Sequence, residues 1–154
     1  MLFIIEGIKG SGKTTLAKEI CSSFNVPYFN ERGSGVFFND LKPGEVRNLV
    51  AKHVLFVELE FFKQVDFCID RFHISEAAYR IINGENKIDY FNEIEKEIIK
   101  ISHMLIFCKT DIDVAKSRLY NRDGVIPDNL ELSYEIFWDI YSGSKLNKIA
   151  VTRN

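Results

Sequence analysis

Residues 7–14 constrain the fold of this chain more than any other segment. They read G-I-K-G-S-G-K-T, which satisfies the pattern G-x-x-x-x-G-K-[ST]. The apolar run Leu2–Ile5 precedes the pattern, and apolar residues recur at helical spacing over Lys13–Phe24. We therefore predict a strand, a glycine-rich turn and a helix, which is the local structure that this pattern requires.

The same turn predicts a binding site for a triphosphate. Glycines let backbone N–H groups close around a dense anion, and the N-terminus of the following helix adds partial positive charge. Lys13 would reach the β- and γ-phosphates, and the Thr14 hydroxyl would ligate Mg2+. We expect ATP and Mg2+ as cofactors, bound by Gly7, Lys9, Gly10, Ser11, Gly12, Lys13, Thr14 and Thr15. The pattern alone does not separate kinases from switches, motors and transporters.

Short apolar strands alternate with helical patterns along the rest of the chain. Further strands are expected at Val26–Phe29, Val65–Ile69, His103–Cys108 and Ile149–Val151. Further helices are expected from Pro43 to about Lys63, through Tyr79 to Ile82, over Tyr90–Ile101, from Val114 onward and over Leu130–Tyr141. Polar loops are expected at Asn30–Gly35 and at Arg122–Pro127. This alternation implies a three-layer α/β domain with a parallel sheet covered on both faces.

Length and composition favour one domain over residues 1–154. The chain has 154 residues, of which 46% are hydrophobic, so a single core can form without disulfides or structural metals. No internal repeat, low-complexity tract or linker marks a domain boundary.

The net charge indicates the class of partner, and the cysteine content indicates the cellular location. The formal net charge is -2, so no global positive field favours nucleic acid or an anionic membrane, and a small-molecule nucleotide or nucleoside is the expected partner. The apolar start ends at Glu6, far short of a signal or membrane-spanning segment. The three scattered cysteines fit a reducing, cytoplasmic location.

Asp70 and Arg71 follow the predicted strand Val65–Ile69. The carboxyl ends of parallel strands are where α/β proteins place catalytic side chains. A carboxylate at this point can hold Mg2+ directly or through water, and a guanidinium beside it can neutralise a phosphate during transfer. The alternative is that Asp70 caps the next helix and that Arg71 is a surface residue.

Three segments resemble the thymidylate kinases. Residues 70–79 read D-R-F-H-I-S-E-A-A-Y and are similar to the D-R-[YF]-x-x-S-x-x-A-Y motif of that family at identical spacing. Residues 3–8 resemble the start of those enzymes, and residues 115–122 resemble the entry to their lid helix. The resemblance spans about the first 125 residues, within which only these three segments are specific.

The resemblance implies a P-loop nucleoside monophosphate kinase fold. Its features would be a five-stranded parallel sheet in the order 2-3-1-4-5, an arginine-bearing lid over about residues 118–128 and a possible homodimer. Arg71 would hold the acceptor phosphate, and Ser75 and Tyr79 would line the acceptor pocket. Arg118 and Arg122 would supply charge to the transition state or stack on the donor base.

Three departures from the family bear on the substrate. Lys9 stands where the family usually has an acidic residue, and a lysine there favours an anion. Arg80 replaces the glutamine that helps to read thymine. Residues 30–33 read N-E-R-G and match the family's R-E-P-G only loosely.

The deoxynucleoside kinases offer a rival alignment, in which Glu31 is the general base for an acceptor hydroxyl. Alternatively, Glu31 has no catalytic role and pairs with Arg32 or with solvent. A kinase acting on a polynucleotide end or a modified base, and an ATP-binding regulator without phosphoryl transfer, are two further alternatives. The first predicts salt-sensitive nucleic-acid binding, and the second predicts ATP-Mg binding without product.

Overall fold

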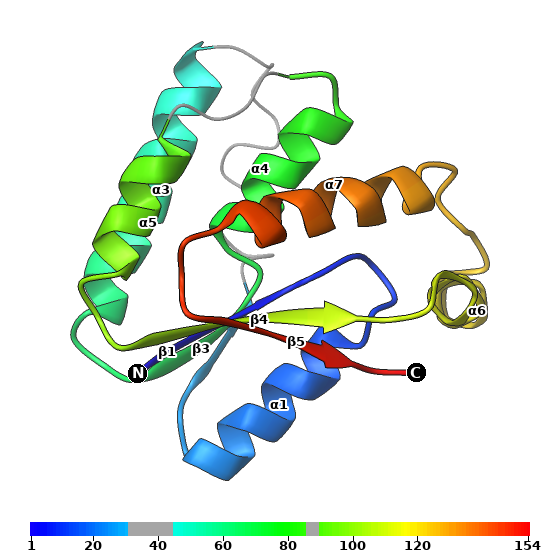
Figure 1. The fold of residues 1–154 in the computed structure, drawn as a ribbon, viewed down its shortest axis with the longest axis horizontal. Coiled ribbons are helices and arrows are strands. Elements are labelled where there is room, and N and C mark those ends of the chain that lie inside the picture. Colours follow the sequence, from blue (N-terminus) through cyan, green and yellow to red (C-terminus); the bar gives the residue numbers. More distant parts are fainter. Residues whose placement is uncertain (31–44, 86–89) are drawn as a thin grey trace.

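The fold is built on a five-stranded parallel sheet. The structure is a computed structural model of residues 1–154, and it describes residues 1–30, 45–85 and 90–154, apart from the side chains of 45–48. The strands are β1 (Leu2–Glu6), β2 (Tyr28–Asn30), β3 (Phe67–Asp70), β4 (His103–Lys109) and β5 (Lys148–Thr152). Their order is β2-β3-β1-β4-β5, and every pairing is parallel (Figure 1). The predicted sheet order is therefore confirmed.

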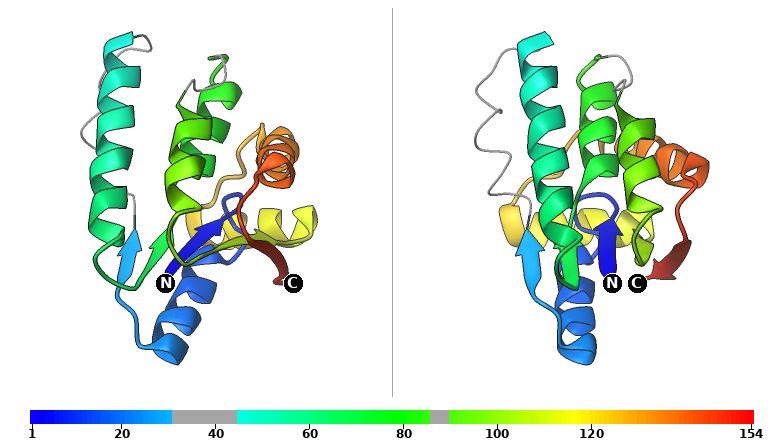
Figure 2. Two further views of the ribbon diagram at one scale, coloured as in Figure 1. Left: turned by 60° about the vertical axis from the view of Figure 1, so that its left-hand side comes forward. Right: turned by 90° about the vertical axis from the view of Figure 1, so that its left-hand side faces the viewer.

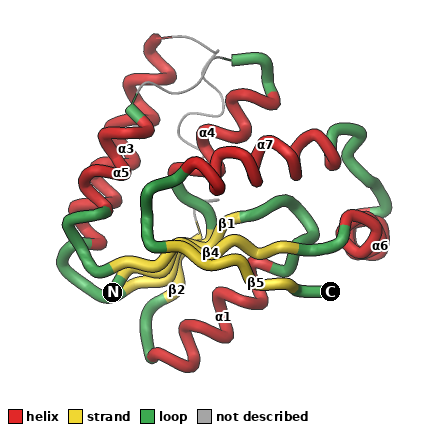
Figure 3. The backbone as a smooth tube through the Cα atoms, viewed as in Figure 1, coloured by secondary structure: helices red, strands yellow, loops and turns green. Residues whose placement is uncertain are grey.

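Helices cover both faces of the sheet, as predicted. Those in the described part of the chain are α1 (Lys13–Phe24), α3 (Glu45–Phe62), α4 (His73–Ile82), α5 (Phe91–Ile98), α6 (Ile112–Asp123) and α7 (Leu130–Gly143). Figures 1 and 2 show α1 on one face and α3, α4, α5 and α7 on the other, with α6 beyond the carboxyl end of β4. Figure 3 shows the resulting order of layers as helix, strand and helix.

Each face of the sheet has its own apolar cluster. All five residues of β1 are buried, as expected for a central parallel strand covered on both sides. Leu2 and Ile4 pack toward α3, α4, α5 and α7, whereas Phe3 and Ile5 pack with Leu16 of α1. Residues of opposite parity thus face opposite layers, because side chains alternate along a strand.

Some predicted boundaries were wrong. The polar loop expected from Arg122 begins at Gly124, because α6 continues to Asp123 and ends on Gly124, whose φ is 71°. A left-handed glycine is a common helix terminator. Residues 118–123 of the expected lid are thus the last turns of α6. Asn30, expected in a loop, is the last residue of β2.

The strand register places the two predicted functional segments side by side. Ile5 of β1 is paired with Asp70 of β3, so the turn after β1 and the residues after β3 leave the sheet at the same edge. None of the helices in the described ranges is long and apolar enough to cross a membrane.

The central strand should dominate the stability of the fold. Ile4 is fully buried, so we expect Ile4→Ala to lower the free energy of unfolding by about 2–5 kcal/mol through lost burial and a residual cavity. The matched control is Ile149→Ala on the edge strand β5, where the side chain is 50% exposed, and the expected loss is below about 1 kcal/mol. Urea unfolding measures both variants, and equal losses would contradict this account of the core.

Candidate active site

A cleft of about 310 Å3 lies at the carboxyl ends of β1 and β3. It contains most of the residues that the sequence predicted to act together. Among the twelve described residues that line it, six are lysine or arginine and one is a carboxylate, so this part of the cleft is rich in positive charge although the chain's net charge is -2. The lining residues are Lys9, Gly10, Gly12, Lys13, Thr14, Thr15, Asn30, Asp70, Arg71, Arg118, Arg122 and Arg153.

The turn between β1 and α1 has the form expected of a phosphate cradle. Gly10 and Gly12 have φ values of 79° and 89°, a left-handed region that residues with side chains avoid. Gly12 is the N-cap of α1 and makes no side-chain cap, so the first-turn N–H groups of α1 remain available to an anion at the cleft.

Gly10 also sets the position of α6. A Cβ atom at Gly10 would lie 2.7 Å from the backbone oxygen of Ala115, too close for any side chain. This contact lets α6 pack directly against the turn, and it brings Arg118 over the turn. The Nη1 atom of Arg118 donates to the backbone oxygens of Gly10 at 3.4 Å and Arg153 at 2.9 Å.

Lys13 is held inside the turn. Its Nζ donates to the backbone oxygen of Ile8 at 2.5 Å, and the side chain is only 6% exposed. The pKa of Lys13 is lowered from 10.5 to about 7, first because burial desolvates the ammonium and then because Arg71 is near, while Asp70 and Glu6 act in the opposite direction. A phosphate beside Nζ would favour the protonated form.

Asp70 faces Thr14 across the cleft, as the predicted metal site requires. The Thr14 hydroxyl donates to Oδ2 of Asp70 at 2.6 Å, and the Tyr28 hydroxyl donates to the same atom at 3.1 Å. Asn30 in turn donates to the Tyr28 oxygen at 2.9 Å. Burial raises the pKa of Tyr28, so this group remains a hydroxyl donor at neutral pH.

The second oxygen of Asp70 makes the site suitable for a cation. Asp70 Oδ1 is buried and has no hydrogen-bond partner among the residues that the structure describes. A buried carboxylate oxygen without a partner is costly, and a bound Mg2+ or its water would satisfy it. The hydroxyl of Thr14 and the carboxylate of Asp70 therefore fit Mg2+, which usually takes few protein ligands beside phosphates and water.

Arg71 has a strained backbone and an ordered side chain. Its φ is 78°, which is uncommon for a residue with a Cβ, and its N–H donates to the backbone oxygen of Ile5 at 2.9 Å. Its Nη1 donates to Ser75 at 3.3 Å, and its guanidinium lies 5.3 Å from the centre of the Tyr79 ring. The structure thus brings together Arg71, Ser75 and Tyr79, three of the four residues that were expected to contact the acceptor.

Glu6 is an organising residue that the sequence analysis missed. Its side chain is fully buried, and its Oε1 accepts hydrogen bonds from the backbone N–H groups of Phe72 at 2.8 Å and Ser75 at 3.2 Å. Its Oε2 accepts from the Ser75 hydroxyl. Glu6 therefore serves as the negative cap of α4 from a strand 66 positions earlier in the chain. A glutamate directly before the first glycine of the motif was the available signal.

Arg153 and the Tyr28–Asn30 pair were also missed. Arg153 lines the cleft and makes two hydrogen bonds to Glu19, at 2.9 and 2.6 Å. It follows the last strand, β5, so only the sheet order reveals that it reaches the phosphate turn. No local pattern around Tyr28 or Asn30 indicates a contact with Asp70.

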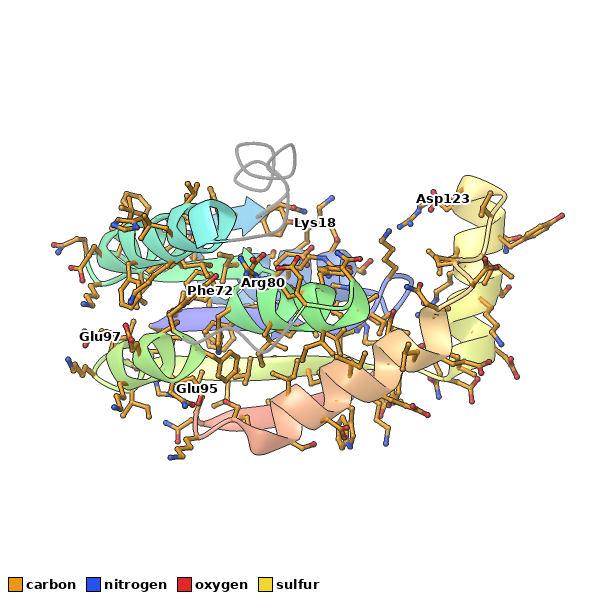
Figure 4. All side chains as sticks on the ribbon, turned by 90° about the horizontal axis from the view of Figure 1, so that it is seen from above. Lys18, Phe72, Arg80, Glu95, Glu97 and Asp123 are labelled. Atoms are coloured by element: carbon orange, nitrogen blue, oxygen red, sulfur yellow. The ribbon has the colours of Figure 1, made fainter. Side chains whose placement is uncertain are left out.

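Three other residues from the sequence analysis, Arg122, Arg80 and Glu31, are not placed at the centre of the cleft in the described structure. Arg122 lines the cleft but makes two hydrogen bonds with Asp123, at 2.7 and 2.6 Å, and Figure 4 shows Asp123 at the outer end of α6. Arg80, which Figure 4 labels, is buried and donates to Glu76 at 2.6 Å, and it is not among the residues that line the cleft. Arg80 is thus part of the packing of α4. Glu31 lies outside the described residues.

The buried ammonium of Lys13 predicts a pH-dependent stability. Between pH 7 and 10.5 the unfolded chain holds a proton that the folded chain has released, so the wild type gains stability as pH rises through this window. Lys13→Met removes the charge at similar length, so the variant should be the more stable protein at pH 6, and its advantage should shrink toward pH 10. Unfolding by urea at several pH values measures the difference, and a constant difference would contradict the lowered pKa.

A family model matches two thirds of the chain. The model described as "ATPase family associated with various cellular activities (AAA)" matches residues 3–105, which run from β1 into β4 and include the phosphate turn, Asp70 and Arg71.

Curated relatives and solved structures are nucleotide-handling proteins. The cytidylate kinase of Sulfolobus acidocaldarius is 26% identical over 129 residues, covering 83% of this chain and 65% of that enzyme, so the chain spans just under two thirds of its length. A probable thymidylate kinase of Methanococcus aeolicus is 26% identical over 167 residues, covering 94% of this chain and 74% of that protein. The YorR protein of Bacillus subtilis, solved in complex with phosphorylated GDP, has the same fold, with a TM-score of 0.74, 21% identity and coverage of 99% of this chain and 85% of that one.

The family match, the phosphate turn and the sheet order agree with one another, and the resemblance to thymidylate kinases is confirmed. The chain belongs to the ATPase family that this model describes, as a P-loop NTPase with distant homology to cytidylate and thymidylate kinases.

Proposed function

We propose that this protein transfers the γ-phosphate of ATP-Mg to a nucleoside monophosphate or deoxynucleoside monophosphate. The observation that carries the proposal is the shared cleft, in which Lys13 of the phosphate turn lies with Asp70 and Arg71. Homology to cytidylate and thymidylate kinases supports the same reaction class.

The donor triphosphate would occupy the turn side of the cleft. Lys13 contributes an ammonium next to the backbone amides of the turn, and its pKa rises again when a phosphate oxygen approaches. Arg118 lies over the turn and is held there by the backbone oxygen of Arg153. Arg122 reaches the same cleft from the last turn of α6. These cations offset the charge that develops on the transferring group and on the leaving oxygen.

Thr14 and Asp70 would hold the Mg2+ ion, which when bound neutralises the β- and γ-phosphate oxygens. The Tyr28 hydroxyl fixes the carboxylate of Asp70 in the orientation that Thr14 shares. The residues that hold the metal are thus oriented before any nucleotide enters.

The charge of the cleft favours a monophosphate acceptor over a nucleoside. A phosphate monoester carries a charge of about −1.5 to −2 at pH 7, and the described lining of the cleft, with six lysine or arginine residues and one carboxylate, can accommodate it beside a triphosphate. Its oxygen is already anionic and can attack the γ-phosphorus without losing a proton. A bond forms between this oxygen and the γ-phosphorus as the bond between the γ-phosphorus and the bridging β-phosphate oxygen breaks. ADP leaves with the electron pair of the broken bond.

Arg71 is the residue that would hold the acceptor phosphate. Its guanidinium lies between the cleft and the residues Ser75 and Tyr79 of α4. A hydroxyl acceptor would instead need a general base, and the carboxylate that lines the cleft in the described part of the chain, Asp70, already accepts bonds from Thr14 and Tyr28.

A phosphoryl-transfer screen tests the proposed function. The wild type is incubated with ATP-Mg and either nucleoside 5′-monophosphates, nucleosides or 5′-hydroxyl oligonucleotides, and products are separated by anion-exchange chromatography. We expect transfer to monophosphates, and we expect Lys13→Ala to lower kcat by at least about 10²-fold because it removes charge stabilisation at the transferring group. The matched control is Lys18→Ala, an exposed lysine on the same helix, which should retain activity. Binding of ATP-Mg without transfer to any acceptor would favour a regulator instead.

Two substitutions at Arg71 separate its chemical role from its backbone strain. Arg71→Ala and Arg71→Gly should both lower kcat/KM for the acceptor by about 10- to 100-fold, because each loses a charged hydrogen-bond donor. Arg71→Gly should be the more stable of the two by about 1 kcal/mol, since glycine adopts a φ of 78° without steric cost.

Steady-state kinetics with each substrate varied and urea unfolding measure these effects. An equal rise of KM for ATP-Mg and for the acceptor would place Arg71 on the donor side and contradict the assignment.

A further inference from the structure

Cys21 of α1 and Cys68 of β3 lie together where α1 packs against the sheet (Figure 1). The Sγ atom of Cys68 is 3.8 Å from the backbone oxygen of Ala17, one helical turn before Cys21. In an α-helix that oxygen accepts the N–H of Cys21, and the Cα–Cβ bond of a helical residue tilts toward the N-terminus. The side chain of Cys21 therefore leans toward the turn that Cys68 contacts, and the two thiols interact.

The two thiols differ in their access to solvent. Cys68 is fully buried in an apolar cluster with Leu16 and Ala17 of α1, and burial raises the pKa of its thiol. Cys21 is half-buried at the edge of the same cluster, so a small solute can reach its sulfur. Oxidation begins at an accessible sulfur, and a neighbouring thiol can resolve the product into a disulfide. The pair thus consists of an accessible cysteine with a second cysteine behind it.

The third cysteine, Cys108, is too far away to replace either partner. It lies on β4, and β1 separates β4 from β3, so two strand spacings, about 10 Å, lie between Cys108 and Cys68. A disulfide needs Cα atoms within about 7 Å of each other. The Cys108 thiol donates to the backbone oxygen of Ser11 at 2.9 Å, before α1 begins. Cys21 lies about 12 Å further along α1, measured from Lys13.

We propose that Cys21 and Cys68 form a site of reversible oxidation, at which hydrogen peroxide converts the two thiols to a disulfide. The Cys21 thiolate attacks one peroxide oxygen, the O–O bond breaks, and hydroxide leaves with its electron pair. Cys21 is then a sulfenic acid, oxidised by two electrons, and the peroxide has been reduced. The Cys68 sulfur attacks the Cys21 sulfur, the S–O bond breaks, and the proton of Cys68 and the departing hydroxide form water. Two equivalents of a thiol reverse the reaction by exchange.

The disulfide would connect the two elements that carry the cleft. Helix α1 begins with Lys13 and Thr14, and β3 ends with Asp70, two residues after Cys68. Closing the bond replaces a contact between two sulfur atoms by a shorter covalent link, so α1 and β3 must shift relative to each other. Such a shift alters the hydrogen bond between Thr14 and Asp70, which is 2.6 Å long in the reduced protein. We therefore expect the disulfide form to bind ATP-Mg more weakly.

This inference goes beyond the proposed function, because it concerns binding of the donor nucleotide and does not depend on the acceptor.

Peptide mapping tests whether the pair closes. The starting protein is Cys108→Ser, which leaves Cys21 and Cys68 as its only thiols and keeps a hydroxyl donor for Ser11. The reduced protein is treated with hydrogen peroxide, remaining thiols are alkylated, and proteolytic fragments are analysed by mass spectrometry without reduction. We expect a cross-linked peptide with Cys21 and Cys68, in a protein that stays monomeric on non-reducing electrophoresis, and we expect dithiothreitol to remove the cross-link.

The matched controls are Cys21→Ser and Cys68→Ser, each in the Cys108→Ser background. Neither control can form the disulfide, and either one suffices if the other does not fold. Calorimetry with ATP-Mg then measures the consequence. We expect peroxide to weaken binding by at least about threefold in the starting protein, and dithiothreitol to restore it. The controls should bind ATP-Mg equally well before and after peroxide.

Three results would overturn the inference. The first is the absence of the cross-link, whether or not dimedone traps a sulfenic acid at Cys21. The second is a cross-linked protein that binds ATP-Mg with unchanged affinity, because the disulfide would then not act on the cleft. The third is an equal loss of affinity in the controls, which would assign the effect to another residue. Phosphoryl transfer by the reduced protein is unaffected by all three, so the proposed function stands or fails separately.

Discussion

The buried carboxylate of Glu6 joins the two halves of the site. Glu6 is the last residue of β1 and immediately precedes the phosphate turn. Its carboxylate accepts hydrogen bonds from the backbone N–H groups of Phe72 and Ser75 and from the Ser75 hydroxyl, at the start of α4. An ionised carboxylate is costly to bury without partners, so the polypeptide after β3 must stay where it supplies them. Arg71 directly precedes these residues, has a left-handed φ of 78° and lines the cleft.

The positive charge of the molecule is concentrated at the cleft. The chain as a whole is slightly negative, yet cations are concentrated where β1, β3 and α6 converge. Crowded cations oppose one another, and this opposition contributes to the lowered pKa of Lys13. Asp70 Oδ1, which has no hydrogen-bond partner in the described part of the chain, would conversely be stabilised by a cation. Both groups are held in states that a metal-bound polyphosphate would relieve, which is typical of a binding site organised in advance of its ligand.

The alternation of short apolar strands with helical patterns predicted a three-layer α/β domain with a parallel sheet and the approximate position of most elements. The order of the strands came from the resemblance to the thymidylate kinases. One boundary was wrong for a local reason. Helix α6 runs to Asp123 because Gly124 ends it in a left-handed conformation, although the polar residues there suggested a loop. Arg80 was read as a difference in base recognition, but its guanidinium is engaged by Glu76 inside the helical layer.

For the site, the phosphate turn, Asp70 and Arg71 could be identified from the sequence, since their chemistry depends on local spacing that the chain itself carries. Glu6 and Arg153 could not, because their roles arise from contacts between segments distant in sequence. Glu6 meets α4 across 66 positions, and Arg153 reaches the turn only because β5 ends at the same edge of the sheet as β1. Local patterns thus determine which residues can bind phosphate. The packing of distant segments decides which of them meet, because that packing depends on sheet order and burial.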